Sequence, residues 1–212
     1  MSSRFVRDES GFTLPELLVT MLMMITVMFA LYSIFDMSLR VFSFGNDKTE
    51  AVANARLGME KMEREIRAAY PQDKAANPSN TTLLTSWTAN SITFGNDLNG
   101  NWKIECISGG PCETISYSIY QPTGSSTFSL GRVNTFGGSS QPVSEFVNRV
   151  SPTDTGLEFR YFEKNGTTEI LPGGDEKKIA IVRTELRIKV ERGIQAGTQT
   201  LTTDVALRNR EG

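Results

Sequence analysis

The chain has 212 residues, a formal net charge of −2 and no histidine. The lack of histidine excludes a Ser-His-Asp triad, a Cys-His pair and every His-ligated metal site, and two cysteines are too few for a four-thiolate zinc site. The small acidic excess argues against a dedicated nucleic-acid binder, which usually has a clear basic excess. The length allows one domain with a sizeable core, or a smaller domain with an extension.

Apolar residues are concentrated near the N-terminus. Residues 1–11 are polar, whereas the nineteen residues from Leu17 to Phe35 contain no charge. About 20 such residues in a helix cross the hydrocarbon core of a bilayer. A buried core helix is usually shorter or amphipathic, and a secretory signal peptide has a shorter apolar region followed by a small-x-small cleavage site. The pattern therefore predicts a membrane-spanning helix over residues 12–35.

The string GFTLPELL, residues 11–18, marks the start of this helix. A carboxylate such as Glu16 beside the hydrocarbon is costly and usually functional, with a partner, and a helix N-terminus favours it. Gly11 allows an extended backbone to enter a protease site without an obstructing side chain. Pro15 suits the first helical turn, because the N–H groups there have no partners within the helix.

This string, joined to the apolar helix, resembles the processing motif of type IV prepilins and type II secretion pseudopilins. The resemblance implies that a membrane aspartic peptidase, the prepilin peptidase, cleaves between Gly11 and Phe12 and methylates the new amine of Phe12. Residues 1–11 would then be a leader peptide, and the mature chain would be Phe12–Gly212. The resemblance also implies an assembly role for Glu16, which would pair with the N-terminal amine of a neighbouring subunit and set the axial register.

A helical period continues beyond the apolar run. Six apolar residues recur at spacings of three and four, namely Val52, Ala55, Met59, Met62, Ile66 and Ala69. Such a seam predicts an amphipathic helix that packs on a sheet, with a coiled coil to another protein as the alternative. Pro71 ends the pattern. We therefore expect one long helix over residues 12–70, which could break or bend at Gly45-Asn46-Asp47.

Residues 71–212 predict an exported β-rich head. Residues 71–90 are expected to form a loop, and residues 121–150, rich in Ser, Gly, Thr and Asn, an exposed insertion between strands. Strand-like runs between turn residues lie at 91–94, 102–106, 114–120, 156–163, 178–190 and 200–207. The expected fold class is α+β, with one long helix on an antiparallel sheet of four to seven strands. This layout also matches the pilin-like fold that the resemblance implies.

The order of two segments points to a subgroup of the family. ARLGMEKMEREIRAA before a proline, followed by the aromatic strand LEFRYFE, resembles J-type minor pseudopilins and related minor pilins. Major pilins often have a proline midway along the apolar helix, and this chain has none there. The missing proline favours a minor subunit. Pro15 departs from the aliphatic residue that most members of the family have at that position.

Val182 to Val190 alternate apolar and polar side chains, which is the period of a strand with one buried and one solvated face. The polar positions include a basic stripe of Arg183, Arg187, Lys189 and Arg192. A DNA contact is one interpretation of the stripe. A solvated strand face is the other, and the interspersed Glu185 and Glu191 favour it.

Two further features concern the head. Cys106 and Cys112 flank the turn sequence Ile-Ser-Gly-Gly-Pro, and two cysteines across a hairpin in an exported domain are expected to form a disulfide. A redox-active pair is more often Cys-x-x-Cys.

Asp97, Asn99 and Asn101 are candidate calcium ligands, and some pseudopilins bind calcium. However, the glycine is misplaced for an EF-hand loop, and these residue types also make good turns, so we expect no metal.

Together these features predict a minor pilin or pseudopilin, a structural and assembly subunit of a type IV pilus or type II secretion pseudopilus. We expect no enzyme activity and no cofactor. The alternatives are a major pilin subunit, a competence-type minor pilin that aids DNA uptake, and a membrane-anchored hydrolase, for which the chain has no Ser-x-x-Lys motif.

The expected partners are other pilin or pseudopilin subunits, the prepilin peptidase, the inner-membrane assembly platform and the lipid bilayer, but not nucleic acid. Arg4 and Arg7 precede the apolar run, which favours a cytoplasmic N-terminus and an exported head. The expected location is the cell membrane, as a single-pass protein. The subunit would then join a pilus or pseudopilus at the cell surface or in the periplasm.

Overall fold

The structure, a computed structural model, describes residues 11–71, 74, 76–106, 111–124, 128–135, 139–147, 156–192 and 195–208. The chain divides into two compact units, Met1–Gly45 and Asn46–Gly212. Helix α1 (Leu14–Arg67) begins in the first unit and ends in the second. The predicted leader peptide, with Arg4 and Arg7, lies outside the described residues except for Gly11.

In the first unit, α1 has no buried side. Residues 11–35 are exposed throughout, including large side chains such as Phe29 and Tyr32. The most apolar 18-residue window of α1 has a mean hydropathy of 2.3, and none of it is buried. The described residues therefore contain one helix that is long and apolar enough to cross a membrane, by length and composition.

The helix does not break at Gly45-Asn46-Asp47, where the sequence allowed a break or a bend, because all three residues are helical. The helix instead ends at Arg67, three residues before the predicted end. The reason lies in the sheet: the Tyr70 N–H donates to the Gly95 carbonyl oxygen at 2.8 Å, in an isolated antiparallel bridge. The chain leaves the helix before Pro71 so that Tyr70 can make this contact.

The described residues of the second unit contain nine strands and a short 3-10 helix, η1 (Glu176–Lys178). The strands are β1 (Leu84–Trp87), β2 (Ser91–Gly95), β3 (Pro111–Tyr120), β4 (Phe128–Thr135), β5 (Gln141–Val147), β6 (Leu157–Phe162), β7 (Glu169–Ile170), β8 (Ile181–Arg192) and β9 (Gln195–Ala206). They form one antiparallel sheet in the order β1-β2-β3-β4-β5-β8-β6-β7, with β9 paired to β8. The predicted α+β class is confirmed, with more strands than expected.

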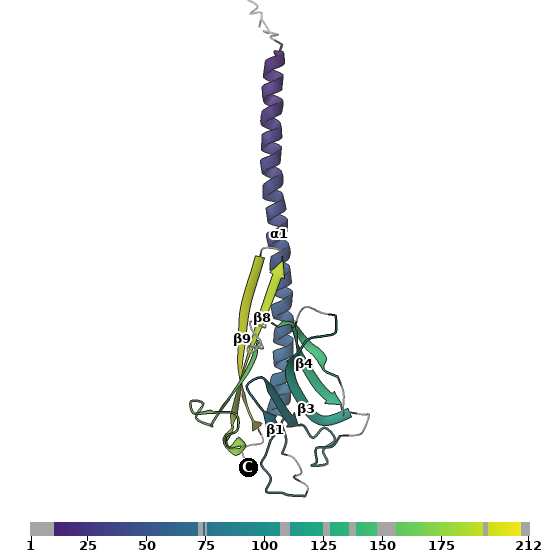
Figure 1. Cartoon of the computed structure of the whole chain (residues 1–212), viewed down its shortest axis with the longest axis vertical. Helices are drawn as coiled ribbons and strands as arrows, with labels where there is room; N and C mark the ends of the chain where they lie inside the picture. The colour runs from purple at the N-terminus through teal and green to yellow at the C-terminus, as the bar shows by residue number, and fades with distance from the viewer. Residues whose placement is uncertain are drawn as a thin grey trace, which may run out of the picture. The chain divides into compact units, whose positions relative to one another are not determined.

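The sheet has two halves. The strands β1 to β5 pair in succession, and β5 meets β8 through one described pair of residues, Val147 and Ile188. The strands β6 and β9 pair with opposite edges of β8, and β7 pairs with β6. In Figure 1, β3 and β4 lie on one side of the last turns of α1, and β8 and β9 lie on the other.

Three expectations about the strands are wrong. The predicted loop at 71–90 contains β1, and the predicted insertion at 121–150 contains β4 and β5. Both segments bury an apolar residue, Leu84 in β1 and Leu130 in β4. The many Ser, Thr and Gly residues around them conceal the alternation that would have predicted a strand. Residues 102–106 form no strand, because the side chains of Asp97, Asn101 and Glu113 bind backbone N–H groups of this segment.

The apolar seam of α1 packs on the sheet, as predicted. Four of its residues are buried (Ala55, Met59, Met62 and Ile66), Ala69 just past the end of α1 is buried with them, and Val52 is partly buried against the same core. The largest fully buried side chains opposite them come from the strands: Phe94, Tyr117, Phe159 and Tyr161. The alternation on β8 is also confirmed, because Val182, Thr184, Leu186, Ile188 and Val190 are buried and the residues between them are not.

A polar cluster ties the helix to the sheet at the edge of this core. The Tyr117 hydroxyl donates to Glu65 Oε2 at 2.6 Å, and Arg132 Nε donates to the same oxygen at 2.8 Å. Burial, and then the neighbouring carboxylate, raise the pKa of Tyr117. Burial opposes the charge of Arg132, but the hydrogen bonds and charge of Glu65 raise its pKa overall. Tyr117 therefore stays protonated and Arg132 stays charged over the whole physiological range, and both remain bound to Glu65.

We predict that Glu65→Ala lowers the free energy of unfolding by about 3 kcal/mol, because it leaves the mostly buried Arg132 without its counter-ion. Glu169→Ala is the matched control, since its ion pair with Arg160 is about one-third exposed on both sides. The control should cost less than about 1 kcal/mol. Denaturant unfolding of the purified chain measures both values, and equal losses would contradict the assigned role of Glu65.

Candidate functional site

The N-terminus of α1 is built as a helix cap. Thr13 precedes the first helical residue, Leu14, and the Glu16 carboxylate folds back onto it. The Thr13 N–H donates to Glu16 Oε2 at 3.1 Å, and the Thr13 hydroxyl donates to the same oxygen at 2.9 Å. A glutamate three residues after a capping threonine satisfies one of the free N–H groups at a helix start. Pro15 lies in this first turn, where no N–H is needed.

Sequence reasoning missed this capping role of Glu16. The signal was present as Thr-x-x-Glu directly before an apolar run, which is a common pattern at helix starts. The cap accounts for one carboxylate oxygen, Oε2. Among the described residues, Glu16 Oε1 has no hydrogen bond and the carboxylate has no cationic partner.

The opposite end of the uncharged run is arranged differently. There Asp36 pairs with Arg40 on the next turn of α1, with Arg40 Nε 2.9 Å from Asp36 Oδ2. A carboxylate therefore lies at each end of the apolar run. Only Asp36, at the later end, has a cationic partner within the described residues. Gly11, Phe12 and Thr13 are exposed and non-helical, and Phe12 is 80% exposed.

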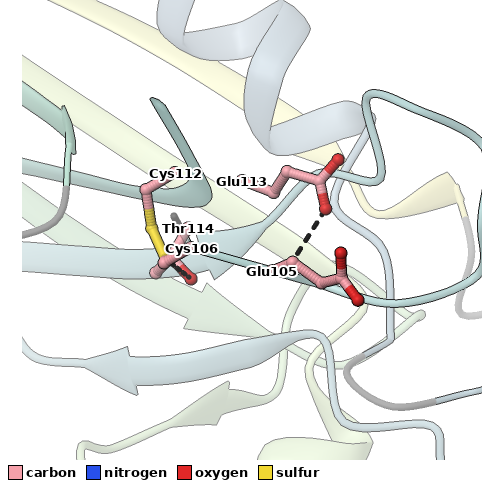
Figure 2. The surroundings of a disulfide bond; sticks show 5 residues. All are labelled: Glu105, Cys106, Cys112, Glu113 and Thr114. Carbon is pink, nitrogen blue, oxygen red and sulfur yellow. Dashed lines mark hydrogen bonds between the residues drawn. A yellow bond between two sulfur atoms is a disulfide. The ribbon is translucent and has the colours of Figure 1, made fainter. Parts of the chain in front are cut away.

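Cys106 and Cys112 form a disulfide at the start of β3, as Figure 2 shows. The two residues form an antiparallel bridge with their Cα atoms 4.0 Å apart. This geometry fits the predicted disulfide. Residues 107–110, between the two cysteines, lie outside the described residues.

Glu113, beside the disulfide, organises the preceding loop. Its Oε1 accepts hydrogen bonds from the N–H groups of Leu98 and Asn99, at 3.0 and 3.2 Å. Its Oε2 accepts from the Glu105 N–H at 3.1 Å, the dashed line in Figure 2. Glu113 is 8% exposed, so these bonds are shielded from water. Sequence analysis missed this residue, because its partners are backbone groups that only the fold brings near it.

The candidate calcium ligands lie together in this loop, but they bind the backbone of the loop. Asp97 Oδ1 accepts from the N–H groups of Gly100 and Asn101, and its Oδ2 accepts from Trp102 at 2.9 Å. Asn99 and Asn101 each accept from the N–H two residues later. Within the part of the chain that the structure describes, no three His, Cys, Asp or Glu residues are arranged to hold a metal ion. Trp102 has φ 66°, a left-handed conformation that these bonds help to hold.

The basic stripe on β8 is a paired strand face. Arg183 donates two hydrogen bonds of 2.7 Å to the Asp204 carboxylate on β9, and its guanidinium lies over the Phe162 ring. Arg187 Nη2 lies 3.9 Å from Glu158 Oε2 on β6. The hydrogen bonds from Arg183 lower the pKa of Asp204. The side chain of Arg192 lies outside the described residues. The described arginines of the stripe thus have carboxylate partners within the sheet.

Comparisons with known proteins add no assignment. No family model, no curated protein and no solved structure matches this chain. The function is therefore argued from the residues and geometry of the chain itself.

We predict that Glu113→Ala speeds hydrogen exchange at the amides of Leu98, Asn99 and Glu105, because each loses its carboxylate acceptor. The free energy of unfolding should fall by about 2 kcal/mol or more. Glu105→Ala is the control, since the described bond to its carboxylate is a single long one from Asn101, at 3.3 Å. Mass spectrometry of exchanged peptides measures the effect. Unchanged exchange in Glu113→Ala would contradict the organising role.

Proposed function

We propose that this chain is a prepilin-type subunit that is cleaved after Gly11, anchored in a membrane by the first part of α1, and assembled into a type IV pilus or pseudopilus. One observation carries the proposal: the first part of α1 is apolar and exposed on every side, and it begins with a carboxylate that has no cation among the described residues. The assembled partners would be other subunits of the same kind.

The energetics of Glu16 support an intermolecular partner. An ionised carboxylate at the boundary of the hydrocarbon costs several kcal/mol unless a cation or strong donors compensate it. The cap engages Oε2 and leaves Oε1 to accept a further hydrogen bond. The amine of Phe12 on a neighbouring subunit, freed by cleavage, supplies a positive charge at the matching depth. This pairing would set the axial register between subunits.

The backbone at the cleavage site also supports the proposal. Gly11 and Phe12 precede the helix and are non-helical, so a peptidase can bind the bond between them without unwinding α1. A Cβ on Gly11 would meet no described atom within 4 Å, so the described residues give no packing reason for a glycine there. The glycine is then explained by the requirement of the peptidase for an unobstructed backbone.

A minor subunit fits better than a major one. The chain has no proline between Pro15 and Pro71, and α1 is helical throughout Leu14–Arg67. The resemblance of the later segments to J-type subunits supports the same choice. The DNA-uptake alternative gains no support from the stripe on β8, because Arg183 and Arg187 are paired with carboxylates. An assembly subunit of this kind has no catalytic step.

We predict that Glu16→Ala leaves membrane insertion unchanged but reduces incorporation into filaments at least tenfold, because the partner amine loses its counter-ion. Asp36→Asn is the matched control at the other end of the apolar run, where the charge already pairs within the helix. Immunoblots of sheared filaments and of membranes measure both steps. Normal incorporation of Glu16→Ala would overturn the assembly role.

We predict that the protein purified from filaments begins at methylated Phe12, and that Gly11→Val keeps the leader and stays in the membrane. Gly45→Val is the control, since this exposed helical glycine also has open space around it. Mass spectrometry of the N-terminal peptide measures the outcome. An intact leader on the wild-type chain in cells with active peptidase would refute the prepilin assignment.

A further inference from the structure

The strand β9 is a long free edge of the sheet. It pairs with β8 along its whole length, from Ile181 opposite Ala206 to Arg192 opposite Gln195, with no bulge. No other described strand pairs with it, so its second edge presents alternate N–H and C=O groups without a strand partner. The side chains of one face are exposed: Ala196, Thr198, Thr200, Thr202, Asp204 and Ala206.

The other sheet edges are guarded against pairing. The strand β1 has 4 residues and a bulge, and the N–H groups of Leu83 and Leu84 at its start are bound by Glu176 Oε1, at 3.1 Å each. The strand β7 has 2 residues. The strand β5 contains Pro142, and its pairing to β4 is bulged. Short strands, bulges and proline are common means of preventing edge-to-edge association.

The strand β9 has none of these protections. It has 12 residues, no proline and no lysine. Its single charged residue, Asp204, is bound by Arg183 of the adjacent strand, at 2.7 Å through each of two bonds. A regular, nearly uncharged edge of this length is a template for an added strand. The other edges have features that prevent strand pairing, and β9 has none of them. The edge of β9 is therefore available to pair with an added strand.

We propose that β9 pairs in antiparallel fashion with β9 of a second copy of this chain, about a two-fold axis at Leu201. In this register Thr200 lies opposite Thr202 of the second copy, and Thr198 lies opposite its Asp204. Threonine pairs across strands are favourable, and no like charges face each other. On the other face, Leu201 lies opposite itself and extends the partly buried apolar surface of the sheet.

Closure of the pair favours a second copy over another occupant. A two-fold contact uses the same surface on both chains, so it covers both free edges and then stops. Pairing of β9 with a different edge would leave one β9 open at the end of each assembly, with the risk of continued aggregation. This inference is independent of the proposed function, because it rests on residues of the second unit alone.

The experiment uses the full chain in detergent micelles, with single nitroxide labels introduced through Thr202→Cys or Ala206→Cys. Antiparallel pairing about Leu201 places the two Thr202 backbones about 8 Å apart and the two Ala206 backbones about 34 Å apart, from about 3.4 Å per residue and 4.8 Å between strands. Electron paramagnetic resonance should therefore give a short distance at Thr202 and a long one at Ala206. Association through α1 alone gives no such gradient and would overturn the proposal.

Charge substitutions give an independent test. Thr202→Lys places two ammonium groups close together across the paired edges and should weaken the dimer at least tenfold in sedimentation equilibrium. Thr167→Lys, in the exposed segment between β6 and β7, is the matched control and should leave the dimer unchanged. Circular dichroism confirms that both variants fold. A wild-type chain that stays monomeric at its highest soluble concentration, or a dimer indifferent to Thr202→Lys, would refute the pairing of β9.

Discussion

The change in surface along α1 is the constraint on which the other features depend. Its first part is apolar on all sides and exposed, whereas its last part has a single seam that is buried in the head. A helix that is apolar on all sides needs an apolar environment around it, and a helix with one seam needs a single packing surface. One helix therefore requires two environments, an apolar one around the first part and a sheet against one side of the second.

The packing of the second part determines how the head is organised. The seam is narrow, so the sheet places aromatic residues such as Phe94 and Phe159 against it. At the border of this core, the carboxylate of Glu65 connects α1 to β3 and β4 through Tyr117 and Arg132. Each of these polar groups has a hydrogen-bond partner, which offsets the free-energy cost of burying it. The directional bonds also restrict the helix to one rotation on the sheet.

Carboxylates have a recurring role in this protein as acceptors for backbone N–H groups. Glu16 caps α1, Asp97 and Glu113 hold the loop before the disulfide, and Glu176 binds the start of β1. Each one satisfies N–H groups that no regular element serves. Of these four carboxylates, Glu16 alone is exposed and directly precedes the uncharged part of α1, and this combination makes it the centre of the proposed assembly site.

Patterns within one element were readable from the sequence: the apolar run to Phe35, the seam from Val52 to Ala69, the alternation on β8 and the cysteine pair. Each depends on a period or spacing that the sequence displays directly. The tertiary structure alone decided that β1, β4 and β5 join the sheet, that residues 102–106 do not, and that Glu113 and Glu65 serve as acceptors. Those outcomes depend on contacts between distant segments, where burial of a few residues such as Leu84 and Leu130 outweighs local composition.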